Sequence, residues 1–394
     1  MVGFFLGGWL RYHAPMRDEE LIREHIDTEL ERGAAVVVAT ICGVQGSSSR
    51  PLGSRMVITE GETFVGSVSG GCVEGDVARR AAEVFRDQVP RTLDYGPVSD
   101  PILEVGLNCD GRIEVILEYV DSRQAEAFFP PIGSALVTRY RVIGDGTADV
   151  THYWETPNAN TANIADAANI AGSAHTTAAL EAPWHRTTIV DGVEWSELVE
   201  PRPPKPLLLI VSAGSPAAPL AVFGREMGYR VVISDPRETY ARRELFPAAH
   251  EVICCWPRDL PQVVGVGPGG IGARCAVVSL NHEPRFEDDL FRMLMGQPSV
   301  GYLGALGKRR RHTERIERQA REGFDLKRLP EIHTPIGLDL GGRDAQDIAL
   351  AIIAEIQAVR TGASGGFLSS RGTRRPAPGA TGSASSLYST YRPG

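Results

Sequence analysis

The sequence predicts an α/β protein whose C-terminal half is a doubly wound, Rossmann-like parallel sheet of about five strands, preceded by an α+β domain. Two observations carry this prediction. Residues Leu207–Arg237 run as an apolar strand, a turn of small residues, an apolar-periodic helix that ends at Gly228, and a second apolar strand, Arg230–Ser234. Asp235 then follows that strand, about 20 residues after Gly214, where an acidic side chain of this fold accepts from ribose hydroxyls.

The turn before the helix carries a weaker signal. A dinucleotide fingerprint asks for three glycines, and this chain has Ser212, Gly214 and Ala217 at those positions. Only the glycine that lets the backbone approach a pyrophosphate is present. Two interpretations therefore stay open: a nucleotide site that includes Gly214, Asp235 and Arg237, or a strand-to-helix crossover that binds no ligand.

Composition narrows the class of protein. The chain has 394 residues, 42% hydrophobic and 23% charged, which is enough for two globular domains. A net charge of −8 and a pI near 5.7 argue against nucleic-acid binding. The six cysteines form no CxxC pair, which disfavours a disulfide framework and a structural zinc site and suits the cytoplasm.

The first domain is expected over residues 16–200, after a disordered leader at 1–15 whose apolar run is too short to span a membrane. Apolar residues at helical spacing predict a helix over Asp18–Glu31, and a buried strand follows at Ala34–Ile41. The loop Cys42–Arg55 then gathers serines and arginines around glycines, and short strands lead to Ser69.

The segment Ser69–Asp76 carries the sharpest local chemistry. Gly70 and Gly71 end a strand, and a helical pattern begins near Val73, with Ala82 among the residues on its apolar face. Cys72 therefore lies at a helix amino terminus, where free N–H groups hold an anion and lower the pKa of a thiol. The alternative is a small cysteine buried under a tight turn.

Strands are also expected at Arg91–Tyr95 and Arg112–Val120, and the loop between them presents Cys109 beside Asp110. A cysteine at such a turn is more often a surface residue than a ligand, and its neighbours do not decide between the two. A variable segment rich in Ala, Asn and Thr follows at about 151–182.

Strands near residues 188–189 and 194–199 close the first domain, and the proline-rich linker 201–206 marks its boundary. The second domain occupies 207–360, and a tail of Gly, Ser, Thr, Pro and Arg at 361–394 is expected to be disordered. Further buried strands are expected at Glu251–Cys255, Cys275–Leu280 and Val300–Leu303.

Polar residues follow two of these strands. Asn281 and His282 come after one, at the carboxyl edge where such sheets bind ligands. Gly304 and Lys308 belong to the glycine-rich, basic stretch after the next, which is either an anion cradle or a solvated helix face. A final helix, capped by Asp344, is expected within Pro335–Ile356.

Six motifs in this order resemble the xanthine dehydrogenase accessory protein family, XdhC/CoxI, over roughly Arg17–Arg360. They are GSSSRPLGSRM, GSVSGGCVEGD, LNCDGRIEV, VVISDPR, GYLGALGKRRRH and PIGLDLGG. The resemblance implies a chaperone that binds molybdenum cofactor during sulfuration by a cysteine desulfurase. It then delivers the cofactor to a molybdenum hydroxylase of the xanthine or carbon monoxide dehydrogenase type. A stand-alone catalyst is not expected.

A carrier of molybdenum cofactor has to bind its phosphate, its pterin and its molybdenum. Anion-binding turns, cationic side chains and a soft sulfur ligand suit these groups. The candidates in the first domain are Ser48, Arg50, Arg55, Ser69, Gly70, Gly71, Cys72, Glu74 and Cys109, with Cys72 and Cys109 as possible molybdenum ligands. Those in the second domain are Gly214, Asp235, Arg237, His282, Gly304 and Lys308.

One departure from the family affects the second domain. Family members commonly have G-A-G-H at the turn where this chain has Ser212, Ala213, Gly214 and Ser215. Ser212 replaces the first glycine of that motif and Ser215 replaces its histidine, so the cofactor or metal role that the family motif implies at these two positions is in doubt. An NAD(P)-dependent oxidoreductase and an adenosyl-ligand-dependent enzyme stay as alternatives. The client enzyme, the pterin or dinucleotide form of the cofactor, and a homodimeric state are left open.

Overall fold

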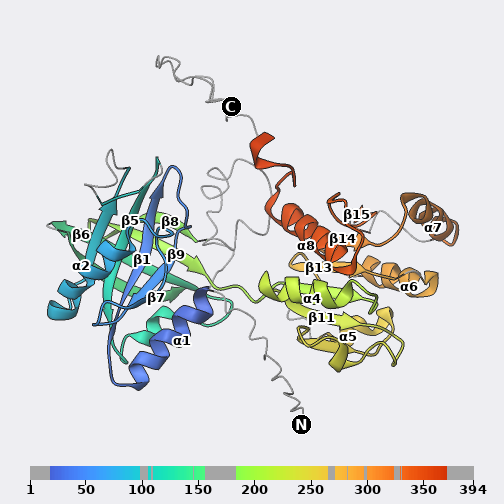
Figure 1. Cartoon of the computed structure of the whole chain (residues 1–394), viewed down its shortest axis with the longest axis horizontal. Coiled ribbons are helices and arrows are strands. Elements are labelled where there is room, and N and C mark those ends of the chain that lie inside the picture. Colours follow the sequence, from blue (N-terminus) through green and yellow to red (C-terminus); the bar gives the residue numbers. More distant parts are fainter. Residues whose placement is uncertain are drawn as a thin grey trace, which may run out of the picture.

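The structure, a computed structural model, describes residues 18–97, 105–107, 110–144, 146–155, 183–264, 271–281, 283–296, 300–323, 329 and 331–370. Figure 1 shows two lobes, each with its own sheet, joined through the segment after residue 201. The predicted leader, most of the variable segment and most of the predicted tail lie outside the described residues. Of that tail, residues 361–370 are described: Thr361 is the last residue of a helix, and a 3-10 turn follows at Leu368–Ser370.

The first lobe is built on one nine-stranded antiparallel sheet in the order β3-β2-β1-β5-β4-β7-β6-β9-β8. Its elements are α1 (Asp18–Glu31), β1 (Val36–Gln45), β2 (Arg55–Ile58), β3 (Phe64–Gly66), α2 (Glu74–Asp87), β4 (Arg91–Tyr95), β5 (Arg112–Val120), a 3-10 turn (Ala125–Phe128), β6 (Ala135–Gly144), β7 (Thr147–Glu155), β8 (Trp184–Val190) and β9 (Val193–Pro201).

Strand β1 is buried on both faces because a helix covers each side of it. Val37 and Ile41 pack into a cluster with residues of α2, whereas Val36 and Val38 pack against α1. A strand between two helices needs apolar residues at successive positions, which explains the unbroken apolar run in the sequence. The predicted α2 face was wrong at Ala82, which is exposed; the buried face is formed by Val77, Ala78, Ala81 and Val84.

Strands β6 and β7 were not predicted, and β8 and β9 are longer than predicted. Strand β6 pairs with β7 on one side and β9 on the other, so these strands complete the sheet. Their polar residues have partners inside the fold. Glu197 has no exposed surface and accepts hydrogen bonds from Arg139, Arg186 and Tyr153.

The linker is hydrogen-bonded to both lobes. Arg202 donates its N–H to the Ser134 carbonyl oxygen, and its own carbonyl accepts from Gly133 of the first lobe. On the other side, the Pro206 carbonyl accepts from the Arg230 N–H. The freely rotating part of the linker is therefore shorter than its proline-rich composition suggests.

The second lobe is a six-stranded parallel sheet in the order β12-β11-β10-β13-β14-β15. The predicted doubly wound fold is confirmed, with β15 as a short sixth strand. The elements are β10 (Leu207–Val211), α4 (Ala217–Glu226), β11 (Arg230–Ser234), 3-10 turns at Arg243–Leu245 and Pro257–Asp259, β12 (Glu251–Ile253), α5 (Leu260–Val263), β13 (Cys275–Ser279), α6 (Pro284–Met295), β14 (Tyr302–Ala305), α7 (Arg309–Arg321), β15 (Ile332–His333) and α8 (Ala345–Thr361).

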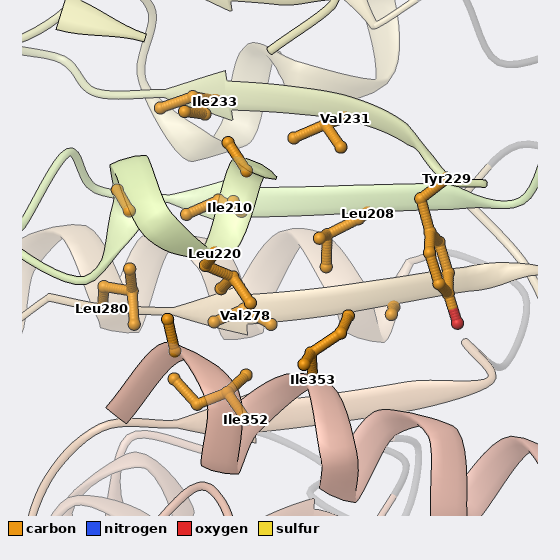
Figure 2. Packing of buried hydrophobic residues seen from close by; sticks show 14 of the residues in the cluster. Leu208, Ile210, Leu220, Tyr229, Val231, Ile233, Val278, Leu280, Ile352 and Ile353 are labelled. Atoms are coloured by element: carbon orange, nitrogen blue, oxygen red, sulfur yellow. The ribbon is translucent and has the colours of Figure 1, made fainter. Parts of the chain in front are cut away.

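Alternate strand residues face opposite helical layers. Figure 2 shows Ile210 and Val278 of the sheet packed with Leu220 of α4 and Ile352 of α8. Residues of opposite parity, such as Val277, pack with α5 and α6 on the other face. The chain reverses its winding between β10 and β13, and this switch point is where open α/β sheets bind ligands.

The start of α8 confirms the predicted cap. The Asp344 and Asp347 side chains form a capping box with the backbone N–H groups of the first turn. Among the described helices, none has both the length and the apolar character needed to cross a membrane.

Candidate functional site

Three motifs of the first lobe meet at one place, which we call the serine–glycine cluster (residues 46–50, 67–74 and 110–111). The Ser49 hydroxyl donates to the Ser69 carbonyl oxygen, and Arg50 Nε donates to the Ser67 carbonyl oxygen at 3.3 Å. Any Cβ at Gly111 would overlap the Ser47 carbonyl, so only glycine allows this approach. Ser48 closes the loop by donating to the Arg50 carbonyl oxygen at 2.7 Å.

Glu74 occupies the centre of this cluster and is only 6% exposed. Its Oε1 accepts from the Ser67 hydroxyl at 2.6 Å and the Ser69 N–H at 2.8 Å, and its Oε2 accepts from the Gly71 N–H at 2.9 Å and from the Ser69 hydroxyl. Further N–H donors come from Val68, Gly70 and Val73. Burial acts to raise the pKa of Glu74, but the hydrogen bonds, led by those from Ser67 and Ser69, outweigh it and lower the pKa to about 2.

This arrangement corrects the prediction of free N–H groups at the start of α2. The Cys72 and Val73 N–H groups both donate to the Ser69 hydroxyl at 2.9 Å, and the preceding amides donate to Glu74. The helix start therefore holds an anion of its own chain. Ser69, Gly70, Gly71 and Glu74 form this internal site, and none of the four has the free donor that we expected for an external phosphate.

The Cys72 thiol lies two residues before α2 and is exposed. The alternative of a cysteine buried under a tight turn is therefore wrong. Cys109 lies outside the described residues, so its predicted role as a ligand stays a prediction. Among the residues that the structure describes, no group of three or more His, Cys, Asp and Glu side chains is placed to hold a metal ion.

Arg55 has a partner within the protein. Its Nη2 pairs with Glu200 Oε2 at the end of β9, and both side chains are largely buried. This pair connects β2 to the last strand of the lobe across a long stretch of sequence. The Arg55–Glu200 pair therefore holds the fold together, while Arg55 Nε is buried without a hydrogen-bond partner among the described residues, and the contact of Arg55 with a bound anion stays a prediction.

The carboxyl edge of the second sheet carries the other candidate site. Asp235, at the end of β11, has no exposed surface. Its Oδ1 accepts from the Arg237 N–H and Nε, each at 2.9 Å, and its Oδ2 accepts from Arg237 Nη2 at 2.7 Å and the Ala213 N–H at 2.9 Å. Burial acts to raise the pKa of Asp235, but the bonds from Arg237 and Ala213 outweigh it and lower it.

The turn after β10 is held by the same carboxylate. The Ser212 hydroxyl contacts Asp235 Oδ2 at 3.3 Å, and Ser212 has a φ of +83°, a conformation that favours glycine. This is the position at which family members commonly have glycine. A Cβ at Gly214 would lie 3.4 Å from the Leu280 carbonyl oxygen, so the turn packs against the end of β13.

Two buried polar groups at the end of β13 lack hydrogen-bond partners within the described part of the chain. Ser279 is fully buried and Asn281 is 5% exposed. The Asn281 Oδ1 accepts from the Glu283 N–H at 2.8 Å, which orients the amide, yet Asn281 Nδ2 and Ser279 Oγ have no hydrogen-bond partner among the described residues. Sequence reasoning missed Ser279, although a serine that ends the apolar run CAVVS was the available signal.

The remaining predicted residues of the second lobe differ in position. His282 lies outside the described residues. Lys308 is exposed and precedes α7 at the carboxyl edge. Gly304 is buried inside β14, where a Cβ would overlap Ile336, so its small size serves packing, and its part in an anion cradle stays a prediction.

Two sequence profiles match the chain and together cover more than half of it. The profile for the XdhC Rossmann domain matches residues 208–356, and that for the XdhC and CoxI family matches residues 29–96. The chain belongs to the XdhC/CoxI family. The resemblance predicted from six motifs is thereby confirmed.

Relatives extend the likeness of this XdhC/CoxI protein over most of its length. A probable xanthine dehydrogenase subunit of Bacillus subtilis is 28% identical over 336 residues, 84% of this chain and 95% of the relative. The molybdenum cofactor insertion chaperone PaoD of Escherichia coli is 26% identical over 333 residues, 84% of this chain and 85% of PaoD. A crystal structure of a xanthine dehydrogenase from Bacillus halodurans shares the fold, with a TM-score of 0.62 and 24% identity, covering 87% of this chain and 96% of that one.

Proposed function

We propose that this protein binds molybdenum cofactor and serves as a maturation factor that delivers it to a molybdenum hydroxylase of the xanthine or carbon monoxide dehydrogenase type. Support comes from membership of the XdhC/CoxI family and from the relative named as a cofactor insertion chaperone. The observation that carries the proposal is the pair of buried, unpartnered donors at the switch point of the second sheet, Ser279 Oγ and Asn281 Nδ2, which lack acceptors among the described residues.

These donors fit the proposed guest. A buried donor without an acceptor costs about 1–3 kcal/mol, so a bound acceptor at this place stabilises the fold. The cofactor carries phosphate and ring oxygens, which are acceptors, and when bound it supplies the oxo-molybdenum centre that the client enzyme uses. Asn281, Ser279 and Arg237 would hold its oxygens, and the Cys72 and Cys109 thiols are the candidate soft ligands or sulfur carriers.

The role requires two kinds of partner. A cysteine desulfurase would provide sulfur while the cofactor is held, and the hydroxylase would receive it. We place both encounters in the cytoplasm, and a homodimer is the expected form of the carrier.

Production in a host that makes molybdenum cofactor tests the proposal. We expect the purified protein to contain molybdenum and pterin in near-equal amounts, measured by metal analysis and by fluorescence of the oxidised pterin. Replacing Cys72 by alanine should lower the molybdenum content while leaving folding intact, because its side chain is exposed. The buried Cys275 replaced by serine is a control for loss of a thiol elsewhere. Protein free of both molybdenum and pterin would contradict the carrier role.

The alternative, an NAD(P)-dependent oxidoreductase that uses Asp235 for ribose, loses its main support. That carboxylate is buried and already accepts from Arg237, Ala213 and Ser212. An adenosyl-ligand-dependent enzyme relies on the same acidic residue and loses support for the same reason.

A further inference from the structure

The Asp235 carboxylate has no capacity left for a ligand. Its two oxygens offer about four lone-pair directions. They receive five donors, from the Arg237 N–H, Nε and Nη2, the Ala213 N–H and the Ser212 hydroxyl. Ribose hydroxyls could bind Asp235 only by displacing Arg237. An acidic residue at this spacing commonly binds ribose, but in this chain Asp235 binds Arg237.

Arg237 is the group that faces outward. Its Nε and Nη2 form a side-on fork with Asp235, and this fixes the plane of the guanidinium. One face of that plane lies over the Tyr240 ring, 3.8 Å from its centroid. The side chain is 41% exposed, and its Nη1 has no hydrogen-bond partner in the part of the chain that the structure describes. The hydrogen bond to Asp235 raises the pKa of Arg237, so its charge is permanent.

The geometry points to a phosphate-binding subsite at the carboxyl end of β11, in which Arg237 Nη1 donates to a phosphate oxygen and Asp235 is a positioning residue. An arginine at this edge suits a phosphate, whereas a free carboxylate suits a ribose diol. Because Asp235 neutralises Arg237, the subsite works by the direction of its donors more than by net charge, and inorganic phosphate alone is expected to bind weakly.

Aromatic side chains border the subsite. The exposed Tyr240 lies against Arg237, and the Phe286 ring lies 6.0 Å from the guanidinium and 5.0 Å from the Trp256 ring. A ligand with a ring next to its phosphate can therefore add stacking to the hydrogen bonds. The inference rests on the proposed function in one respect: it assigns the phosphate-bearing end of the cofactor to the second lobe.

Calorimetry on the full-length, cofactor-free protein tests the subsite with inorganic phosphate, AMP and adenosine. We expect AMP and phosphate to compete for one site and adenosine to bind at least ~10-fold more weakly than AMP, because it lacks the phosphate. Replacing Arg237 by glutamine should weaken AMP binding by about 10-fold or more, the loss expected for a charge-assisted hydrogen bond. AMP that binds much more tightly than phosphate indicates that the site also contacts the nucleoside, as a nucleotide ligand requires; equal affinities indicate that the site recognises the phosphate alone.

Two further variants complete the test. Arg230→Gln removes an arginine from the opposite end of β11 that also pairs with a carboxylate, Glu251, and should leave AMP binding unchanged. The double variant Asp235→Asn with Arg237→Gln leaves no buried charge unpaired and should fold while losing AMP binding. Thermal unfolding monitors the fold of every variant.

Three results would overturn the subsite: no heat with AMP or phosphate at millimolar concentration, adenosine binding as tightly as AMP, or unchanged AMP affinity in Arg237→Gln. The outcome is separable from that of the carrier role. Arginine-dependent AMP binding in a protein that never retains molybdenum would leave the subsite standing and remove the carrier. If the protein retains molybdenum but its AMP binding does not depend on Arg237, the carrier role stands and the subsite is removed.

Discussion

The two lobes use the same local pattern, a strand followed by a turn of serine and glycine and then a helix, in different ways. In the first lobe, Glu74 fills the helix start and satisfies the amides of that turn. In the second lobe, Asp235 binds the turn after β10 and Arg237, whereas Ser279 and Asn281 keep donors without partners among the described residues. The comparison teaches that a turn that resembles an anion site is closed when the chain supplies its own carboxylate. In the second lobe, the two donors of Ser279 and Asn281 lie together at the switch point of the sheet.

The largest expected effect concerns Glu74, whose carboxylate closes the anion site of the first lobe. Glu74→Gln should lower the free energy of unfolding by about 3 kcal/mol, because it removes a buried charge that accepts several hydrogen bonds. Urea unfolding measures the change. Glu83→Gln, on the exposed side of the same helix, is the matched control and should change stability by less than about 0.5 kcal/mol.

The same site predicts a pH dependence. The pKa of Glu74 is lowered from 4.5 to about 2 in the folded protein, so its contribution is fully present above pH 4.5 and is lost as the pH falls towards 2. Glu74→Gln should flatten this part of the profile of unfolding free energy against pH. A profile of unchanged slope would mean that the carboxylate does not carry the internal anion site.

A smaller effect on the free energy of unfolding, of opposite sign, is expected at Ser279 in the second lobe. Ser279→Ala removes a buried hydroxyl without a partner in the described structure and should stabilise the cofactor-free protein by up to about 1 kcal/mol, while lowering its molybdenum content. Ser234 is the matched control. It ends β11 as Ser279 ends β13, and both serines lie beside Val211 of β10. Unlike the Ser279 hydroxyl, which has no partner among the described residues, the Ser234 hydroxyl contacts a carbonyl oxygen, that of Cys255, at 3.5 Å. Ser234→Ala should not stabilise. Destabilisation by Ser279→Ala would show that this hydroxyl is already satisfied.

The smallest effect concerns the turn itself. Ser212→Gly relieves a positive φ but loses the contact with Asp235, so a net gain of only about 0.5 kcal/mol is expected in thermal unfolding. Ser215→Gly, in the same turn but without a positive φ, should not stabilise. A loss of stability in Ser212→Gly would mean that the hydroxyl contact outweighs the backbone strain.

Much of the second lobe could be predicted because its strands are buried on both faces and appear in the sequence as unbroken apolar runs. The runs at Leu207–Val211 and Arg230–Ser234 match β10 and β11 residue for residue. Strands β6 and β7 were missed because their inward polar residues are paired across the sheet: Arg139 with Glu197, and Thr138 with His152. Such pairing interrupts the apolar run of β6 after Ala135–Val137.

The candidate sites were harder to predict, because spacing gives the position of a residue and not its partner. Asp235 lies where the fold rule places an acidic residue, yet Arg237, two positions later, determines what it binds. In the same way, the sequence predicted that the amides before α2 are free to bind an anion, but in the structure they donate to the Glu74 side chain of the same chain.

The anchored linker limits the separation of the two lobes. Arg202 belongs to one lobe by its backbone hydrogen bonds and Pro206 to the other, and Arg274 reaches the Pro204 carbonyl oxygen in between. The segment between Arg202 and Pro206, Pro203–Lys205, spans at most about 10 Å of extended chain, and its Lys205 Nζ pairs with Glu20 Oε1 of α1 at 2.9 Å. A connection of this length limits how far the two lobes can move apart.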